Sequence, residues 1–405
     1  MMLFFRRLPG LCYSYRYSLY STMLVFLVIT HYLLKLRILC LNSHAIDHAN
    51  RVCENFQNGA SSGTLCSALC IRQDISAITC YSYRSTRKVK FRGTWGTIPI
   101  VFKSPTQITL FHWYENGKKT YPGEKQFLAT LKAVTKKKLN MVLPLNTLMR
   151  IMSKTIHSKK SEMPIRDYEM DSLSTLVQDN EFLIMAIFPG NEVFPKILGT
   201  CGIYYCTEYM EPINIKSSLL SLTDSLEEWI QKLQISTQIL ELLNKLETDF
   251  HEPFHLCDIQ LHHFGISSED ESLRYVNLNQ VYPRSVISTM FRNLSCQTDE
   301  DCDINDCRSK CNKDLKICSE GVLNNNYQIV CEKIFLGWKR FNSIIIPGLL
   351  MSQHTPSDLA SVLRQCANPG HEMGKPRMSS ENFIKKRMYE LIVEIEQTVV
   401  SQMSL

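Results

Sequence analysis

The spacing of apolar residues along the chain changes from alternating to helical, and this order predicts the elements. Residues 76–103 predict three strands, SAITCYSY, KVKFRGTW and TIPIVFK, with a turn at Gly96. Residues 193–209 predict two more strands around a turn at 199–202. Apolar residues at helical spacing predict helices over 124–155, 170–188, 217–250 (in two pieces) and 382–400. Strands followed mainly by helices indicate an α+β fold.

A short apolar segment near the N-terminus predicts a membrane anchor. Residues 19–34 carry no charged side chain when His31 is neutral. The span reaches residue 41 if Lys35 and Arg37 extend to the lipid headgroups. A cleaved signal peptide and a buried core helix are the alternatives. We expect an uncleaved transmembrane signal-anchor, with the chain beyond it on the luminal side.

Cysteine usage supports an oxidising compartment. The chain has 16 cysteines, and 14 of them, an even number, follow residue 41. Most lie in two clusters, and these are the residues expected in disulfides: Cys53, Cys66, Cys70, Cys80, Cys296, Cys302, Cys307, Cys311, Cys318 and Cys331. Zinc is the alternative for the second cluster, but the cluster contains no CxxC pair and no histidine. The sequon Asn293-Leu294-Ser295 precedes this cluster and predicts a glycosylated surface loop.

Composition narrows the function classes further. The formal net charge is +6 and 44% of the residues are hydrophobic. These values exclude global disorder, and nothing in them indicates a nucleic-acid partner. The acidic stretch 299–306 could bind calcium, although a solvated loop is the favoured interpretation.

Two stretches of sequence carry a resemblance to a known family. Residues 256–264, LCDIQLHHF, are similar to a kinase catalytic loop, and residues 324–335, NNNYQIVCEKIF, follow the dense cysteine cluster. Together with the anchor and the cysteine pattern, they resemble the divergent protein kinase domain 1 family over about residues 45–400. That resemblance implies a cysteine-rich, single-span, type II protein of the endoplasmic reticulum membrane with a two-lobed protein-kinase-like fold.

The apolar segment and the resemblance together imply a division of the chain. They predict five parts: a cytoplasmic tail at 1–18, a signal-anchor at 19–41, a luminal cysteine-rich segment at 42–80, a kinase-like N-lobe with an insert at 81–210, and a C-lobe at 211–405 that contains the cysteine cluster 296–331.

Four residues match kinase positions by this resemblance. Lys103 would hold nucleotide phosphates and pair with Glu181 on the following helix. Glu208 would lie at the interlobe hinge, where the nucleotide binds. Asp258 would be the catalytic base.

Other positions depart from the kinase pattern. The two metal-ligand positions hold His263 and Asn277 in place of asparagine and aspartate. An imidazole and a neutral amide are poor ligands for magnesium. No GxGxxG motif precedes Lys103. The EF-hand-like stretch 158–169 has Ser158 and Lys160 where calcium requires carboxylates and Met163 where the loop requires glycine.

These departures favour a luminal pseudokinase that acts by binding or scaffolding secretory-pathway proteins. A weak or atypical kinase and an unrelated disulfide-rich ectodomain are the alternatives. Weak ATP binding stays open, whereas functional magnesium and calcium sites are not expected.

Overall fold

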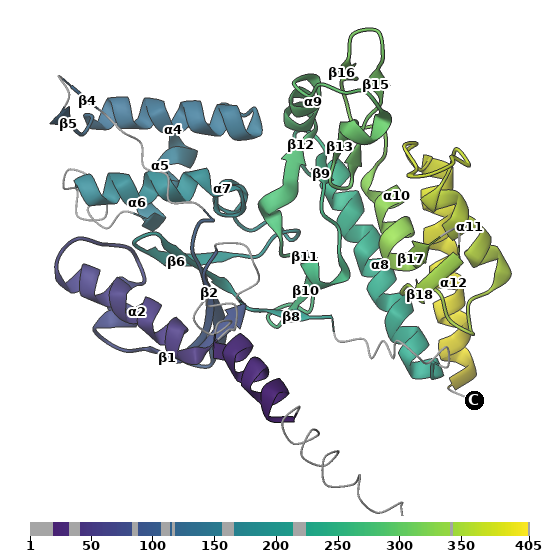
Figure 1. Cartoon of the computed structure of the whole chain (residues 1–405), viewed down its shortest axis with the longest axis horizontal. Coiled ribbons are helices and arrows are strands. Elements are labelled where there is room, and N and C mark those ends of the chain that lie inside the picture. The colour runs from purple at the N-terminus through teal and green to yellow at the C-terminus, as the bar shows by residue number, and fades with distance from the viewer. Residues whose placement is uncertain are drawn as a thin grey trace, which may run out of the picture.

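Five antiparallel strands form the sheet of the N-terminal lobe in the computed structural model (Figure 1), in the order β1-β2-β3-β7-β6. Their bounds are β1 Ile75–Ser82, β2 Lys90–Trp95, β3 Ile98–Lys103, β6 Ile197–Cys201 and β7 Tyr204–Glu208. All five predicted strands are therefore present. The structure describes residues 19–31, 41–82, 88–106, 114–115, 118–155, 166–213, 224–340 and 343–403.

Side chains alternate between the two faces of this sheet, as the pleat requires. Phe91 of β2 lies opposite Phe102 of β3, and their rings stack with centroids 4.8 Å apart. The neighbouring pair, Lys90 opposite Lys103, therefore projects to the other face. One face is apolar and the other carries lysines.

Helices α2 (Asn42–Gln57) and α3 (Cys66–Cys70) cover the apolar face. Ala45, Ala49 and Val52 of α2 share one buried cluster with Phe91 and Phe102 of the sheet. The cysteine-rich segment that the sequence set apart at 42–80 is thus the outer layer of the N-lobe, and β1 begins inside that segment.

Four helices lie on the opposite side of the sheet from α2 (Figure 1). They are α4 Glu124–Leu139, α5 Leu145–Thr155, α6 Asp167–Gln178 and α7 Asn180–Ile187. A hairpin of two short strands, β4 (Tyr114–Glu115) and β5 (Lys118–Lys119), precedes these helices. Both helical stretches predicted from sequence are interrupted: Asn140 ends α4 in a left-handed conformation at φ 53°, and Asp179 is extended between α6 and α7.

A three-stranded sheet connects the lobes at the centre of the molecule (Figure 1), in the order β11-β10-β8. Strand β8 (Met210–Pro212) continues the chain from β7 and pairs with β10 (Phe264–Ser267), which pairs with β11 (Leu273–Tyr275). The predicted lobe boundary at 210/211 falls inside β8.

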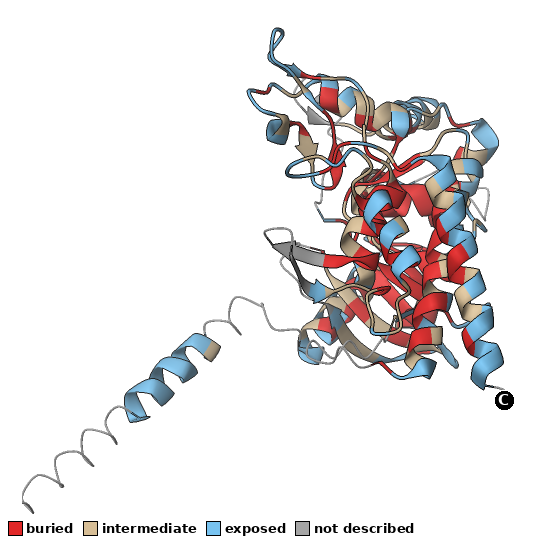
Figure 2. Cartoon of the chain, turned by 90° about the vertical axis from the view of Figure 1, so that its right-hand side faces the viewer, coloured by how far each residue is buried: buried red, intermediate tan, exposed pale blue. Residues whose placement is uncertain are grey.

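The C-terminal lobe is mainly helical. Its helices are α8 Leu226–Thr248, α9 Arg284–Arg292, α10 Asn326–Val330, the π-helix η5 Cys331–Phe335, α11 Ser357–Ala367 and α12 Asn382–Met403. Figure 2 shows a buried interior, with an exposed stripe along the outer helices. The lobe also contains short strands and 3-10 helices. The strands are β9 Phe254–Leu256, β12 Val281–Pro283, β13 Asp303–Ile304, β14 Cys307–Arg308, β15 Cys311–Asn312, β16 Ile317–Cys318, β17 Gly337–Arg340 and β18 Ser343–Pro347. The 3-10 helices are η2 Leu261–His263, η3 Leu278–Gln280 and η4 Asp299–Cys302.

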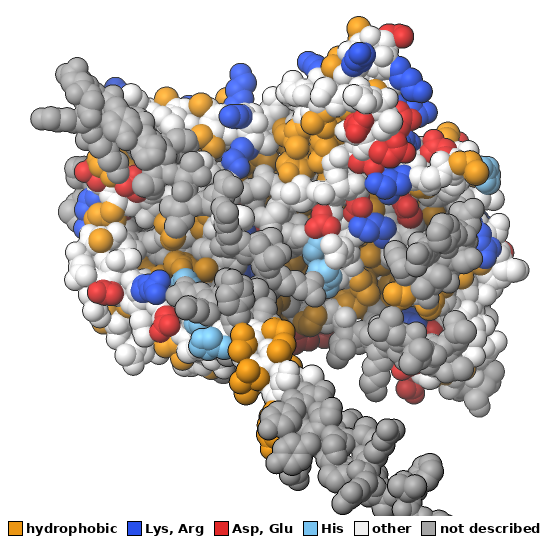
Figure 3. Space-filling model, in the orientation of Figure 1, with side chains coloured by type: hydrophobic (Ala, Val, Ile, Leu, Met, Phe, Trp, Pro, Cys, Tyr) orange, Lys and Arg blue, Asp and Glu red, His pale blue; other side chains and the backbone are white. Residues whose placement is uncertain are grey.

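The helix of residues 19–31 stands away from the body of the protein and exposes its apolar side chains (Figures 2 and 3). Among the residues that the structure describes, no helix has the length and apolar character needed to cross a bilayer. The predicted tail at 1–18, residues 32–40 of the predicted anchor and most of the EF-hand-like stretch lie outside the described residues.

Candidate functional site

The N-lobe side of the site is a buried ion pair. Lys103 ends β3, and its Nζ atom contacts the Oε1 atom of Glu181 in the first turn of α7. Asp179 caps that helix by accepting a hydrogen bond from the Phe182 amide at 2.9 Å. The structure therefore brings together the two residues that the resemblance paired.

A second lysine, which the sequence did not single out, reaches the same carboxylate. The Nζ atom of Lys88 lies 2.7 Å from Oε2 of Glu181 and 3.0 Å from Oδ2 of Asp179. Burial alone would raise the pKa of Glu181, but Lys103, Lys88 and Lys90 outweigh it and hold that pKa well below its usual range. The alternation of Lys88 and Lys90 at the start of the predicted strand KVKFRGTW was the available signal, because residues two apart share a face.

Glu208 ends β7, at the expected hinge. Its carboxylate accepts hydrogen bonds from Arg274 Nη1 at 2.6 Å and from Ser267 Oγ at 3.2 Å, both on the strands of the other lobe. It also accepts one from the Lys196 amide at 2.7 Å. The side chain therefore joins the lobes.

On the C-lobe side, Asp258 follows β9 and is partly exposed. Its Oδ1 atom accepts a hydrogen bond from Gln260 Nε2 at 2.9 Å. The Tyr275 hydroxyl and His263 Nδ1 both donate to its main-chain carbonyl oxygen. These contacts fix the backbone of the loop. The second carboxylate oxygen of Asp258, Oδ2, lies near Asn277.

The two substituted metal positions lie beside Asp258 and bond to each other. Because His263 Nδ1 donates to a carbonyl, its Nε2 atom is free to accept, and Asn277 Nδ2 lies 3.1 Å away. Burial, as the largest cause, lowers the pKa of His263, which favours this neutral imidazole. Asn277 Nδ2 also lies 3.4 Å from Asp258 Oδ2, and Asn279 donates to Asn277 Oδ1 at 2.9 Å.

This donor set does not fit magnesium. A hard divalent cation needs several oxygen ligands, preferably charged. Here one carboxylate stands beside an imidazole and an amide whose oxygen already accepts a hydrogen bond. The polar groups at the metal positions instead satisfy one another.

The N-lobe side and the C-lobe side of the site face one another. Asn180, the first residue of α7, donates through Nδ2 to the main-chain oxygens of Leu278 and Val281, at 2.9 Å each, just after Asn277. Lys90 interacts electrostatically with both Glu181 and His263. We call the combined set of Lys88, Lys90, Lys103, Asp179, Glu181, Asp258, His263 and Asn277 the interlobe site.

Comparison with known families decides what kind of domain surrounds this site. Residues 173–369 match the model described as the protein-kinase domain of FAM69, and residues 7–154 match the one described as the N-terminal cysteine-rich ER region of FAM69. This chain belongs to the FAM69 family. The predicted membership of the divergent protein kinase domain 1 family is thereby confirmed, and the domain is kinase-like.

Among solved structures, this FAM69 chain is similar to the complex of Rv3197 with erythromycin from Mycobacterium tuberculosis. The identity is 14% over 81% of this chain and 74% of that chain, with a TM-score of 0.26.

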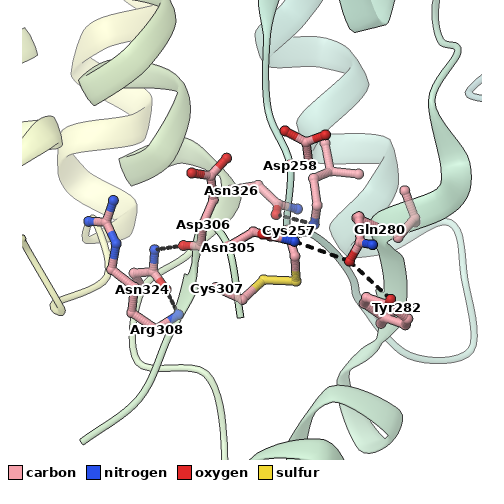
Figure 4. The surroundings of a disulfide bond; sticks show 12 residues. Cys257, Asp258, Gln280, Tyr282, Asn305, Asp306, Cys307, Arg308, Asn324 and Asn326 are labelled. Carbon is pink, nitrogen blue, oxygen red and sulfur yellow. Dashed lines mark hydrogen bonds between the residues drawn. A yellow bond between two sulfur atoms is a disulfide. The ribbon is translucent and has the colours of Figure 1, made fainter. Parts of the chain in front are cut away.

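A disulfide anchors the loop that contains Asp258 in this FAM69 protein (Figure 4). Cys257 is bonded to Cys307 of the second cysteine cluster. The neighbouring Asp306 accepts a hydrogen bond from the Ile259 amide at 2.7 Å and pairs with Lys333 at 2.6 Å. The cluster therefore holds the catalytic-loop position on both sides of Asp258.

Asparagines from the NNN stretch complete this anchoring. Asn324 accepts a hydrogen bond from the Arg308 amide and donates one to the Asp306 carbonyl, each at 2.9 Å (Figure 4). Asn326 does the same for β9, accepting from the Leu256 amide at 2.9 Å and donating to the Phe254 carbonyl at 2.8 Å. The sequence marked this stretch as distinctive, and the structure gives it a bracing role.

All ten cysteines named from the sequence are disulfide-bonded. The pairs within the described residues are Cys53–Cys70, Cys66–Cys201, Cys257–Cys307, Cys296–Cys311, Cys302–Cys318 and Cys331–Cys366, and Cys80 is bonded as well. Cys296, Cys302 and Cys311 lie close enough for a metal, but all three sulfurs are in disulfides, against the zinc alternative. The even count did not mean complete pairing, because Cys206 is a buried free thiol.

Asn293, the acceptor of the sequon, ends α9 and is exposed. This exposure leaves the side chain accessible to a glycan.

Proposed function

We propose that this FAM69 protein is a pseudokinase of the secretory pathway, which binds or organises partner proteins without efficient phosphoryl transfer. The observation that carries the proposal is the mutual hydrogen bonding of His263 and Asn277 beside Asp258. Phosphoryl transfer in kinases relies on magnesium ions that bridge the phosphates and neutralise developing charge. The metal positions have only one carboxylate, that of Asp258, beside them, so they bind such an ion weakly.

The compartment is part of the same proposal. The family description names the ER, the described cysteines are almost all in disulfides, and the sequon is exposed. Disulfides of this number persist in an oxidising lumen. We place the kinase-like domain in the lumen of the endoplasmic reticulum, attached to the membrane through residues 19–41 in a type II topology.

A weak kinase is the second candidate, and one observation favours it. The Lys103–Glu181 pair, which active kinases require, is in place, and Asp258 keeps 28% of its side chain exposed. The lysine, the glutamate and the base are thus present, whereas the metal ligands are substituted and no GxGxxG motif precedes Lys103.

A transfer assay on the full chain, expressed through the secretory pathway, distinguishes the candidates. We expect incorporation of labelled γ-phosphate with magnesium or manganese to be no higher for the unmodified protein than for Asp258→Ala. The double variant Asn277→Asp with His263→Asn should show stronger binding of ATP in the presence of magnesium, because it restores the usual ligands.

The exposed Asn382→Asp variant is the matched control for the added carboxylate, and it should bind as the unmodified protein does. Magnesium-dependent transfer by the unmodified protein that Asp258→Ala abolishes would establish the weak kinase and refute the pseudokinase.

A further inference from the structure

Three lysines project from one face of the N-lobe sheet toward α7. Lys90 and Lys103 are directly opposite each other on β2 and β3, so their side chains share that face. Lys88 precedes Lys90 by two residues, and its ammonium reaches the same two carboxylates, Asp179 and Glu181.

The charges within this group do not balance. Lys103 pairs with Glu181, and Lys88 pairs with both Glu181 and Asp179. Lys90 makes no hydrogen bond or ion pair with any residue in the described part of the chain, although it is half-buried. On the N-lobe side of the interlobe site, three cations therefore face two carboxylates. The third carboxylate of the site, Asp258, lies on the C-lobe side and accepts a hydrogen bond from Gln260. The remaining neighbour, His263 on η2, has an imidazole that accepts a hydrogen bond and adds no negative charge.

A half-buried cation without a partner is costly, and such a group between two lobes is a candidate for binding an anion. Burial and the repulsion of Lys103 and Lys88 outweigh the attraction of Glu181 and lower the pKa of Lys90 to about 8. At neutral pH the side chain is still mostly charged. The site thus offers an ammonium to an anion that enters between the lobes.

We propose that Lys90 is a phosphate-binding residue that allows the interlobe site to hold a diphosphate or triphosphate group without a divalent cation. Lysine binds phosphate as a point charge. Its ammonium supplies positive charge from the N-lobe. This charge takes the place of the metal ion that the substituted positions beside Asp258 do not bind. We assign the phosphates to a nucleotide, because a kinase-like domain offers its nucleotide position between the lobes. The inference rests on the proposed function, since it gives a ligand to the same site.

Calorimetric titration of the full chain in EDTA tests this inference, with ATP, ADP, pyrophosphate and adenosine as probes. We expect ATP and ADP to bind without metal. Lys90→Gln should weaken their binding about tenfold or more, as expected for the loss of a charge-assisted contact. Lys90→Arg, which keeps the charge, should retain most of the affinity, and the exposed Lys136→Gln should change nothing.

The probes also identify the source of the phosphate group. Much weaker binding of pyrophosphate than of ATP supports a nucleotide, whereas equal binding supports free diphosphate in the same Lys90 site. Binding of ATP only when magnesium is present, or equal affinities for the unmodified protein and Lys90→Gln in EDTA, would overturn the inference. Phosphoryl transfer in the preceding assay would refute the pseudokinase alone, since the EDTA titration does not depend on catalysis.

Discussion

Glu181 keeps its negative charge in the protein interior because two lysines reach its two oxygens from different segments. Lys103 comes from the end of β3 and Lys88 from the stretch before β2. Removing one member of such a group leaves the others buried without compensation, which costs more than the pair contributed. The stability of the fold therefore depends on the charges of Glu181 and its two lysines.

We therefore expect Glu181→Gln to lower the free energy of unfolding by about 3–5 kcal/mol. Chemical denaturation followed by intrinsic fluorescence measures this change. Glu192→Gln is the matched control, because Glu192 pairs with Lys245 at an exposed position. That control should change stability little, because water screens an exposed ion pair. Equal losses in the two variants would contradict the role given to Glu181.

Lys90 leads to a prediction about how stability depends on pH, because its pKa is lowered in the folded protein. Its pKa is about 8 in the folded protein, below the usual value near 10.4 in an unfolded chain. Between those values the unfolded chain binds more protons, so the stability of the unmodified protein rises with pH through this window.

Without ligand, Lys90→Gln should therefore be more stable than the unmodified protein at pH 7, by about 1–3 kcal/mol. The difference should shrink as the pH rises toward 10. Unfolding curves collected at several pH values test this, and a Lys90→Gln variant less stable than the unmodified protein at pH 7 would show that the Lys90 ammonium is stabilising.

At the scale of elements, the short helix α10 braces the loop that carries Asp258. Asn326 satisfies an amide and a carbonyl of β9, and Asn325 caps α10 by accepting from the Gln328 amide at 2.9 Å. Buried backbone groups that lose such partners are expensive to leave unsatisfied. The position of the catalytic loop therefore depends on a helix about 70 residues further along the chain.

Asn326→Ala should accordingly destabilise the protein by about 2–4 kcal/mol, since two buried backbone groups lose their partners. Hydrogen–deuterium exchange should show faster exchange at the amide of Leu256 in β9. Asn382→Ala, at the exposed start of α12, is the control and should stay within about 0.5 kcal/mol of the unmodified protein. Unchanged exchange at β9 would rule out the bracing role.

At the scale of the whole molecule, disulfides connect layers that are distant in sequence. Cys66–Cys201 joins α3 to β6 across 135 residues, and Cys257–Cys307 joins the catalytic-loop position to the cysteine cluster. Each closed loop restricts the unfolded chain and stabilises the fold by a few kcal/mol, about 4 for a loop near 50 residues.

Alkylation without reduction tests this framework. Among the cysteines that the structure describes, only Cys206 should be labelled, and only after denaturation, because it is both free and buried. Burial also raises the pKa of its thiol, which slows reaction in the folded state. Mass spectrometry of peptides identifies the labelled positions. Labelling of Cys257 or Cys307 in the denatured, unreduced protein would contradict the pairing beside Asp258.

The sequence alone determined the strands of the N-lobe sheet and several site positions, for a local reason. Strand and helix periods of 2 and 3.6 residues are written in consecutive residues, so β1–β3, β6 and β7 could be predicted from spacing. The family resemblance identified Lys103, Glu181 and Asp258 from short motifs. Asn140 and Asp179 interrupt helices through backbone conformation, which a count of apolar residues does not detect.

The remaining features depend on contacts between residues far apart in the chain. Cys66 could have paired with any of many cysteines, and only the packing of α3 on the sheet brings it to Cys201 while leaving Cys206 free. Lys88 and Lys90 became part of the site because the pairing of β2 with β3 turns them toward α7. Charge partners and disulfide partners are set by distance in space, and only the tertiary structure fixes those distances.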